Sequence, residues 1–309
     1  MFFCLAPIRG ITDHVFRSVY SAHFKGFDCA VAPFISTVKG KTVKLSHIKD
    51  ILPENNRNLP VIPQVIGNNP EDFVVLCQQL YEIGYTTVNW NLGCPFPQVT
   101  KKKRGSGLLP YPEKIELFLE HVCPRIKNKL SVKTRLGLLS KDEMEKFIPV
   151  LNKFPISEVI IHPRTAKQVY SGKVDLIGFE QFMTSTIHPV MYNGDINDVK
   201  SFKDISNKFP KISRFMIGRG ALSNPILLEE IQGITTNYST ITQRIKCFHD
   251  DLFKAYDNYF NNPGNLLDKM KGLWFYLSNT LPENKKFLKS IQKTNNPNEY
   301  KNIINSFSR

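Results

Sequence analysis

The chain has 309 residues, of which 41% are hydrophobic, enough to bury a large core in one domain with an appendage or in two modest domains. Lys and Arg number 41 against 27 Asp and Glu, and the resulting net charge of +14 favours a polyanionic partner such as nucleic acid, although a solvated basic surface explains it equally. No apolar stretch approaches the roughly 20 residues of a membrane helix and the start lacks a signal-peptide pattern, so we expect a cytoplasmic protein with no membrane segment.

Short apolar strands alternate with amphipathic helices along the first 235 residues. Eight strands are predicted at residues 2–6, 27–34, 61–66, 86–91, 131–135, 158–162, 189–193 and 214–217. Helices are predicted after them, at residues 13–24, 38–48 (a weaker pattern), 70–83, 113–126, 141–154, 177–184, 196–207 and 221–232. Eight alternations predict an α/β fold in which residues 1–235 form a (β/α)₈ TIM barrel, because a doubly wound sheet more often stops at five or six strands.

The residues from 240 to 309 have a purely helical pattern. Apolar side chains recur at spacings of three and four in two stretches, 241–259 and 266–281, separated by Asn261, Pro263 and Gly264. Leu281 and Pro282 are predicted to end the second helix, and shorter helices are expected at 285–292 and 298–307. We therefore predict a small helical domain, whose 11 Lys or Arg and 6 Asp or Glu suit a solvated face or an RNA-binding face equally.

One cysteine lies in a stiff turn directly after the fourth strand. In the run NWNLGCPFP at residues 89–97, Gly93 allows a tight turn before Cys94, while Pro95 and Pro97 restrict the exit. A partly buried structural cysteine is the common alternative, but this rigid setting favours a reactive thiol. The six cysteines contain no CxxC pair, so we expect reduced thiols, no zinc or other metal site and no disulfide framework.

Polar residues and glycines follow most of the predicted strands. Active sites of TIM barrels lie at the carboxyl ends of the strands, where this chain carries Pro7 and Arg9, Gln64, Asn91 and Cys94, Lys133 and Arg135, His162 and Arg164, Asn193 to Asp195, and Gly218 to Gly220. The last two groups, NGD and GRG, fit a phosphate site made by backbone N–H groups and a helix N-terminus, and Arg219 adds a charged fork. A phosphorylated cofactor is therefore expected, and flavin mononucleotide (FMN) fits that phosphate.

Several motifs occur in the order of a known family. APIRGITD, VIPQVIG, NLGCPFPQV, GSGLL, VKTRLGL, IHPRT, QVYSG, NGDI and MIGRGAL, spread over residues 5–225, closely resemble the tRNA-dihydrouridine synthases, most of all the bacterial ones. The segment KGLWFYL is similar to that family's RNA-binding helical domain. The resemblance implies an FMN-dependent oxidoreductase that uses NADPH to reduce the C5=C6 bond of a specific uridine in tRNA. We expect it to be a monomer.

The resemblance also implies roles for individual residues. Those implied to bind FMN are Pro7, Ile8, Arg9, Gln64, Lys133 and His162 around the ring and ribityl chain, and Asn193, Gly194, Asp195, Gly218 and Arg219 at the phosphate end. Cys94 would protonate C5 of uracil after hydride reaches C6 from flavin N5, and Asn91 would hold the base. Further RNA contacts are expected from Arg135, Arg164, Gln168 and Tyr170, and from the basic run Lys101, Lys102, Lys103 and Arg104 in the Cys94 loop.

Three positions depart from the family pattern. Asn89 stands where an acid is more common, Ile8 where Met is common and Pro163 where Gly is common, and none of these removes a proposed catalytic atom. Two other functions remain open: an FMN-dependent barrel enzyme acting on a free pyrimidine such as dihydroorotate, and a non-catalytic RNA-binding protein. The sequence does not determine which uridine is reduced, because no short motif records how a whole tRNA lies across the protein.

Overall fold

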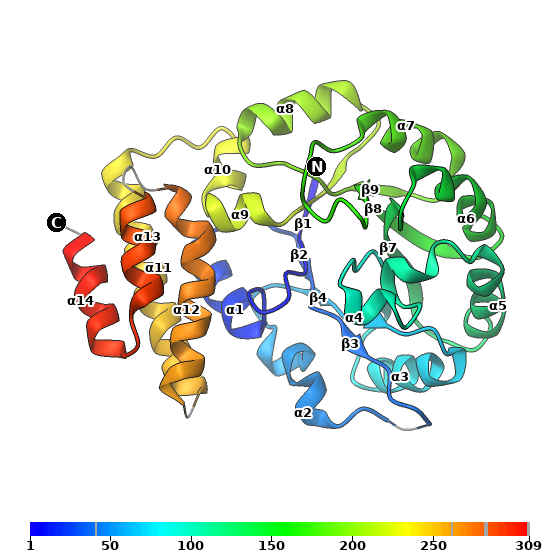
Figure 1. Ribbon diagram of the computed structural model, residues 1–309, viewed down its shortest axis with the longest axis horizontal. Helices are drawn as coiled ribbons and strands as arrows, with labels where there is room; N and C mark the ends of the chain where they lie inside the picture. Colours follow the sequence, from blue (N-terminus) through cyan, green and yellow to red (C-terminus); the bar gives the residue numbers. More distant parts are fainter. Residues whose placement is uncertain (41, 261, 281–283, 308–309) are drawn as a thin grey trace.

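The computed structural model describes residues 1–40, 42–260, 262–280 and 284–307. Its strands all pair in parallel, in the order β3-β5-β6-β7-β8-β9-β10-β1-β2-β4 (Figure 1). They are β1 (Phe2–Leu5), β2 (Cys29–Val31), β3 (Ile35–Ser36), β4 (Val61–Ile62), β5 (Gln64–Ile66), β6 (Thr87–Leu92), β7 (Lys129–Gly137), β8 (Ile156–Thr165), β9 (Val190–Tyr192) and β10 (Arg214–Ile217).

The ten strands occupy eight strand positions around a closed barrel. The second predicted strand is divided into β2 and β3, and the third into β4 and β5, on either side of Pro33 and Pro63. Proline has no N–H to donate to the ladder, which accounts for both interruptions. The strand order begins with β3 and β5 and ends with β2 and β4. Because β2 continues into β3 and β4 continues into β5, the two ends of the order are the two halves of the same strand pair, and the sheet closes. The predicted barrel is confirmed.

Helices surround the barrel in the expected alternation. The longer ones are α1 (His14–His23), α3 (Pro70–Glu82), α5 (Pro112–Val122), α6 (Met144–Leu151), α7 (Leu176–Ser185) and α8 (Val199–Lys208). The weak pattern at 38–48 gives only the short α2 (Leu45–Ile48), and position 41 within it lies outside the described residues. The helix predicted at 221–232 is two helices, α9 (Arg219–Ser223) and α10 (Leu227–Ile231), because Pro225 interrupts it.

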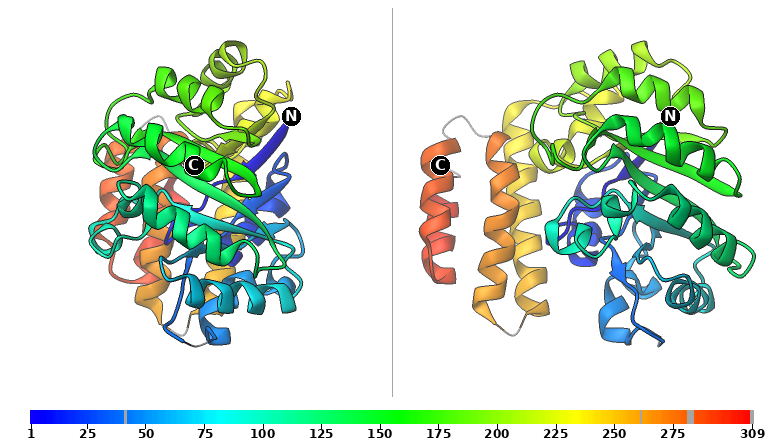
Figure 2. Two further views of the ribbon diagram at one scale, coloured as in Figure 1. Left: turned by 90° about the vertical axis from the view of Figure 1, so that its right-hand side faces the viewer. Right: turned by 45° about the vertical axis from the view of Figure 1, so that its right-hand side comes forward.

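The carboxyl-terminal helices stand beside the barrel (Figures 1 and 2). They are α11 (Tyr238–Tyr259), α12 (Pro263–Leu277), α13 (Asn284–Lys293) and α14 (Pro297–Phe307). Asn261, Leu281 and Pro282, which the sequence places at helix boundaries, lie outside the described residues. No helix in the described part of the chain is long and apolar enough to cross a membrane.

The helical bundle is joined to the barrel by packing and by charge. The Phe248 ring on α11 lies edge-on to the rings of Phe16, Tyr20 and Phe24 on or beside α1, with centroids 5.2 to 6.0 Å apart. Asp13, which caps α1, accepts a 2.8 Å hydrogen bond from the Tyr256 hydroxyl and pairs with Lys269 of α12. The Lys269 Nζ also donates to the carbonyl of Gly10, in the loop after β1, at 2.9 Å. Helix α12 is thereby held against the carboxyl-terminal end of the barrel.

Candidate active site

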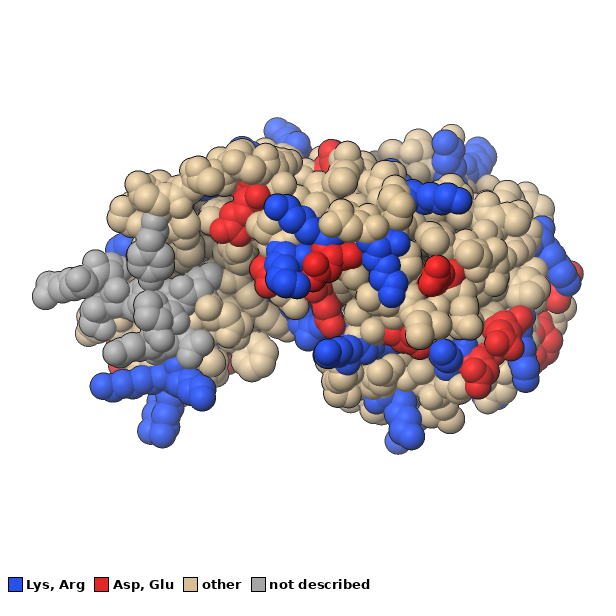
Figure 3. Space-filling model, turned by 90° about the horizontal axis from the view of Figure 1, so that it is seen from above, with Lys and Arg blue, Asp and Glu red and all other residues tan. Residues whose placement is uncertain are grey.

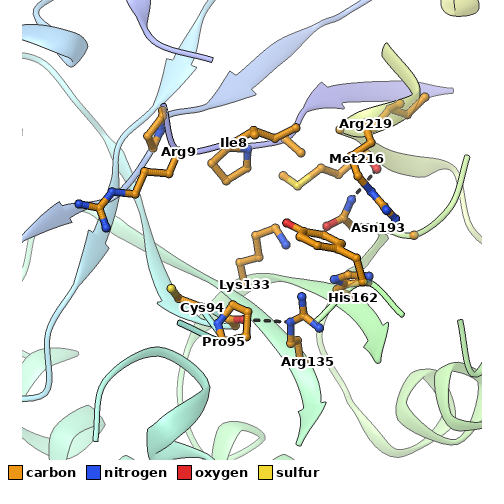
Figure 4. Close-up of a pocket in the computed structure, with 18 of the residues that line it drawn as sticks. Ile8, Arg9, Cys94, Pro95, Lys133, Arg135, His162, Asn193, Met216 and Arg219 are labelled. Atoms are coloured by element: carbon orange, nitrogen blue, oxygen red, sulfur yellow. Dashed lines mark hydrogen bonds between the residues drawn. The ribbon is translucent and has the colours of Figure 1, made fainter. Parts of the chain in front are cut away.

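A pocket opens where the carboxyl ends of the strands meet. Its cavity has a volume of about 230 Å³. Each of the eight strand positions of the barrel contributes to its walls through the strand itself or the loop after it, and α12 adds Tyr276. In the close-up (Figure 4), Lys133 lies in the middle, and Arg9 and Arg219 lie at opposite ends. Fifteen predicted site residues meet in this pocket: Pro7, Ile8, Arg9, Gln64, Asn91, Cys94, Lys133, Arg135, His162, Tyr170, Asn193, Gly194, Asp195, Gly218 and Arg219.

A chain of buried amides connects the barrel interior to the Cys94 turn. Asn91 accepts from the backbone N–H groups of Gly93 and Cys94 at 3.0 and 2.9 Å, and its Nδ2 donates to Gln64 Oε1 at 2.7 Å. Gln64 Nε2 then donates to Asn89 Oδ1 at 2.8 Å. The chain ends where Asn89 Nδ2 donates to Ser131 Oγ at 3.0 Å, whose hydroxyl donates to the carbonyl of Val88 at 3.2 Å.

The direction of this amide chain is fixed at both ends. A backbone N–H can only donate and a backbone carbonyl can only accept, so the oxygen of Asn91 must face the Cys94 turn. Each following amide is then oriented by the one before it. Asn91 therefore has one N–H left for a ligand, whereas its oxygen already accepts two hydrogen bonds.

Glycines and Arg135 hold the Cys94 turn from outside. Gly105 has φ +56°, and a Cβ there would lie 2.8 Å from the Cys94 carbonyl oxygen, so only glycine fits. That carbonyl accepts from the Ser106 hydroxyl at 2.8 Å. Arg135 Nε donates to the Gly93 carbonyl at 3.0 Å. The GSGLL motif thus packs directly against the turn that carries the thiol.

The Cys94 thiol is protonated at neutral pH. Burial raises its pKa above the ordinary 9.0, and the opposing effects of a backbone N–H at Phe96 and of the cations Arg9, Arg135 and Lys133 do not reverse this. Cys94 is only 7% exposed, yet it lines the pocket. A protonated thiol that faces a cavity can supply a proton to a bound ligand.

Lys133 lies in the pocket without an anionic partner, and its ammonium and amine forms are both populated near neutral pH. Loss of hydration lowers its pKa to about 7, and repulsion by Arg135 adds to the effect. Its Nζ makes no hydrogen bond or ion pair with the described residues. A desolvated ammonium in this position is suited to an electron-rich or anionic ligand.

His162 is neutral and its tautomer follows from its neighbour. Burial lowers its pKa well below the ordinary value, and Arg135, Lys133 and Arg164 lower it further. Arg164 Nη1 lies 3.1 Å from His162 Nε2, and because a guanidinium has no acceptor, Nε2 must accept. The proton of His162 is therefore on Nδ1.

Arg164 lies behind the pocket wall. It is 1% exposed, and its guanidinium binds the Asp195 carboxylate and the carbonyls of Ser171 and Gly172. The expected direct contact between Arg164 and the substrate does not fit this burial, and the residue instead supports the loop after β8. Asp195, at φ +34°, also accepts from Arg219 at 2.8 Å, so its carboxylate orients two arginines.

An aromatic side chain from the loop after β8 reaches over the pocket. Tyr170 is 49% exposed, and the Arg219 guanidinium lies 4.4 Å from its ring centroid. The preceding Val169 has φ +50°, which is rare for a β-branched residue and is a form of strain found at functional loops. Gln168 lies outside the pocket and stabilises this loop, because its Oε1 accepts from the Thr165 N–H at 2.8 Å.

The chain matches the dihydrouridine synthase (Dus) family over residues 4–308. A probable tRNA-dihydrouridine synthase of Staphylococcus epidermidis is 32% identical over 237 residues, which cover 74% of this chain and 71% of the relative. One from Aquifex aeolicus is 30% identical over 241 residues, which cover 74% and 72%.

The chain belongs to the dihydrouridine synthase family. It is accordingly an oxidoreductase. The old yellow enzyme homologue from Zymomonas mobilis has a similar structure, with a TM-score of 0.55, 11% identity and coverage of 76% of this chain and 89% of its own. Morphinone reductase in complex with tetrahydroNAD gives a TM-score of 0.53, 9% identity and coverage of 78% and 89%. At such low identity these two structures show the fold alone.

In this member of the dihydrouridine synthase family, the basic run of the Cys94 loop lies outside the pocket. Lys101, Lys102 and Lys103 are exposed beyond the short α4 (Pro97–Thr100), and Arg104 Nε donates to Asn68 Oδ1 at 3.2 Å. They lie on the same loop as the thiol but outside the cavity. Any contact they make with RNA would therefore be outside the space that holds the reacting base.

Sequence reasoning missed several wall residues of this dihydrouridine synthase. Met216 and Asn197 lie inside or beside the MIGRGAL and NGDI motifs, which could have indicated them. Tyr276 lies in the KGLWFYL segment of α12, and that segment gave no indication that it reaches the barrel pocket. The missed residues that line the pocket include Pro33, Phe34, Phe96, Asn197, Met216 and Tyr276. No group of three or more His, Cys, Asp and Glu side chains that could hold a metal ion was found in the described part of the chain.

Proposed function

We propose that this protein reduces the C5=C6 bond of a uridine in tRNA to 5,6-dihydrouridine, with FMN as bound cofactor and NADPH as electron donor. The observation that carries the proposal is that one pocket in a barrel of the dihydrouridine synthase family contains both a protonated Cys94 thiol and a Lys133 side chain that lacks an anionic partner. Both the family match and the names of the curated relatives support this reaction.

The residues present fit FMN. Lys133 lacks an anionic partner and would face the electron-rich edge of the isoalloxazine, where a positive charge stabilises the reduced ring. At the other side, Arg219 and the backbone around Gly194 and Gly218 would hold the phosphate. Helix α9 has five residues, so the guanidinium and individual N–H groups would contribute more than a helix dipole. When bound, FMN would supply the hydride for C6 of uracil after reduction by NADPH.

Cys94 would supply the second hydrogen. Its Sγ holds a proton at neutral pH because burial raises the thiol pKa, and it would pass that proton to C5 of the base. The hydrogen bonds that fix its backbone, from Ser106 to its carbonyl and from its N–H to Asn91, would keep Sγ in one position during the transfer.

Asn91 would hold the base through a carbonyl group. Its oxygen is used by the Cys94 turn, so the remaining N–H can donate to O2 or O4 of uracil and cannot accept from N3–H. This narrows the role expected from the sequence, in which Asn91 both accepts and donates. Arg135 donates to the Gly93 carbonyl of the same turn. Burial lowers the pKa of Arg135 to about 10, so its guanidinium remains charged at neutral pH.

Binding of tRNA would rest on charges outside the pocket. On the face seen from above (Figure 3), basic and acidic side chains alternate over the barrel, so that face presents no continuous basic field. The exposed Lys101, Lys102 and Lys103 lie next to the Cys94 turn and would contact phosphates of the RNA strand that enters the site.

The decisive experiment is mass spectrometry of tRNA before and after incubation with the protein and NADPH. We expect one nucleotide to gain two hydrogens, and its mapping would identify the reduced uridine. Cys94→Ala should retain bound flavin and tRNA affinity while its turnover falls about 10²- to 10⁴-fold. Activity on free uridine or on dihydroorotate, with no change in tRNA, would overturn the proposal. An unchanged turnover rate in Cys94→Ala would contradict the role of Cys94 as proton donor.

A further inference from the structure

A second cavity adjoins the active-site pocket at the seam between barrel and bundle. Its volume is about 630 Å³, and its walls come from the α9–α10 region of the barrel and from α11, α12 and the residues after α12. Asn197, Arg219 and Tyr276 line both cavities. The second cavity therefore lies directly beside the active-site pocket, with these three residues as the wall between them.

We propose that this second cavity binds the base of a nucleotide next to the uridine that is reduced. The proposal rests on the proposed tRNA reduction. A base that reacts must leave its stack and enter the first pocket, and its neighbours remain covalently attached to it. The adjacent nucleotides must therefore lie close to the pocket, and the second cavity is next to it on the side of Tyr276.

An uncovered aromatic ring gives this cavity its affinity for a base. Phe275 is 62% exposed, the largest exposed fraction among the exposed Phe and Tyr side chains in the described part of the chain. Its ring stands at 87° to that of Tyr276, with centroids 5.2 Å apart, and both residues line the cavity. Nucleobases stack on such rings irrespective of their sequence, because every base has an apolar face.

Polar groups around Phe275 suit the edge of a base. The cation on the shared wall, Arg219, is already paired with the Asp195 carboxylate at 2.8 Å. Glu230 lines the cavity and accepts from Asn224 Nδ2 at 2.7 Å, and its carboxylate would repel a phosphate. The same carboxylate can accept from an exocyclic amino group, which cytosine, adenine and guanine carry and uracil lacks. Asn279, whose Nδ2 lies 3.3 Å from the Ser223 hydroxyl, has further donor and acceptor capacity for a base edge.

The first test compares three variants in tRNA reduction. Phe275→Ala should raise the KM for tRNA about 5- to 100-fold, while the rate of flavin reduction by NADPH without RNA stays unchanged. Phe275→Trp should keep most of the affinity because stacking is retained. Ile187→Ala is the matched control, since Ile187 is 73% exposed and lies before β9, away from both cavities.

The second test identifies the partner as a neighbouring base. Once the reduced uridine is mapped, tRNAs with an abasic nucleotide on its 5′ or its 3′ side are assayed with wild type and Phe275→Ala. On one of the two RNAs the substitution should have no further effect, because the stacked base is already missing. Equal losses on both abasic RNAs and on intact tRNA would refute the subsite, as would a Phe275→Ala variant that behaves like Ile187→Ala.

The outcomes separate this inference from the proposed function. Wild-type protein that leaves tRNA unreduced contradicts the proposed function and this subsite together. Wild-type reduction with no effect of Phe275→Ala contradicts the subsite alone. Slower flavin reduction by NADPH in Phe275→Ala would assign the cavity to the electron donor instead.

Discussion

We expect the buried charge of Lys133 to lower the free energy of unfolding of the protein. The pKa of Lys133 falls from an ordinary 10.5 to about 7 in the folded protein, chiefly because burial removes hydration from the ammonium. Between these two values the unfolded chain binds more protons at this residue than the folded one, so stability rises with pH from 7 to 10.5. Below pH 7 both states are protonated and the full cost of the buried charge remains.

The size of this effect follows from the two pKa values. Each pKa unit corresponds to about 1.4 kcal/mol, so the cost is at most about 5 kcal/mol at pH 6 and about 2 kcal/mol at pH 9. Lys133→Met keeps the volume and removes the charge. We therefore expect it to raise the free energy of unfolding of the flavin-free protein by several kcal/mol at pH 6, and by less than half as much at pH 9.

Urea unfolding followed by circular dichroism at pH 6 and pH 9 measures this difference. Lys102→Met, on the exposed run of the Cys94 loop, is the control and should change stability by less than about 0.5 kcal/mol at either pH. The same Lys133→Met protein should lose flavin affinity and turnover, because the ligand loses its cationic partner. A destabilised Lys133→Met, or an equal gain at both pH values, would refute the reasoning.

Three further predictions concern the Cys94 turn. Asn89→Leu should lower the free energy of unfolding by about 1–3 kcal/mol and reduce kcat, because it leaves Gln64 Nε2 buried without an acceptor. Asn89→Asp should reduce kcat less, because its carboxylate still accepts from Gln64, although Ser131 must turn its hydroxyl away from the Val88 carbonyl to donate to it. Measurements of thermal unfolding and kcat distinguish the two variants, and equal losses of kcat would contradict the amide chain. Gly105→Ala, at φ +56°, should cost about 1–3 kcal/mol and slow turnover by displacing the turn; wild-type melting and kcat would exclude this packing. With Cys94 as the acid, kcat should fall as the pH rises above 9, because the thiol, whose pKa is raised from 9.0, then loses its proton. A rise in kcat from pH 9 to 10 would contradict the assignment.

Much of the site could be placed from the sequence because barrel topology is repetitive. Parallel strands that alternate with helices all end at one face, so side chains on the strands and on the turns after them, such as Lys133, His162 and Cys94, meet there even though they lie far apart in the chain. The turn residues were readable for a similar reason. Pro95 and Pro97 restrict the backbone next to Cys94, and such a local restriction leaves a signal in the sequence.

Other features depend on neighbours that no local pattern records. Arg164 lies near the carboxyl end of β8, two residues after His162, yet it is buried against Asp195 because the loop after β8 folds over it. The polarity of Asn91 is set by hydrogen bonds that cross from one strand to the next and end at the backbone of the Cys94 turn. Only the three-dimensional structure determines which way an amide group points, because the residue name is the same for both orientations of its oxygen and nitrogen.

The sequence by itself determined the barrel, the thiol in its stiff turn and the cationic pocket, because strand periodicity, glycine and proline act through the backbone near them. Only the tertiary structure decided what each side chain does there. It showed that Asn91 can only donate to a ligand, because its oxygen already accepts from the Cys94 turn, and that α12 brings Tyr276 into the pocket with Phe275 next to it. Such contacts between distant segments arise from the packing of whole elements, and no local sequence pattern records them.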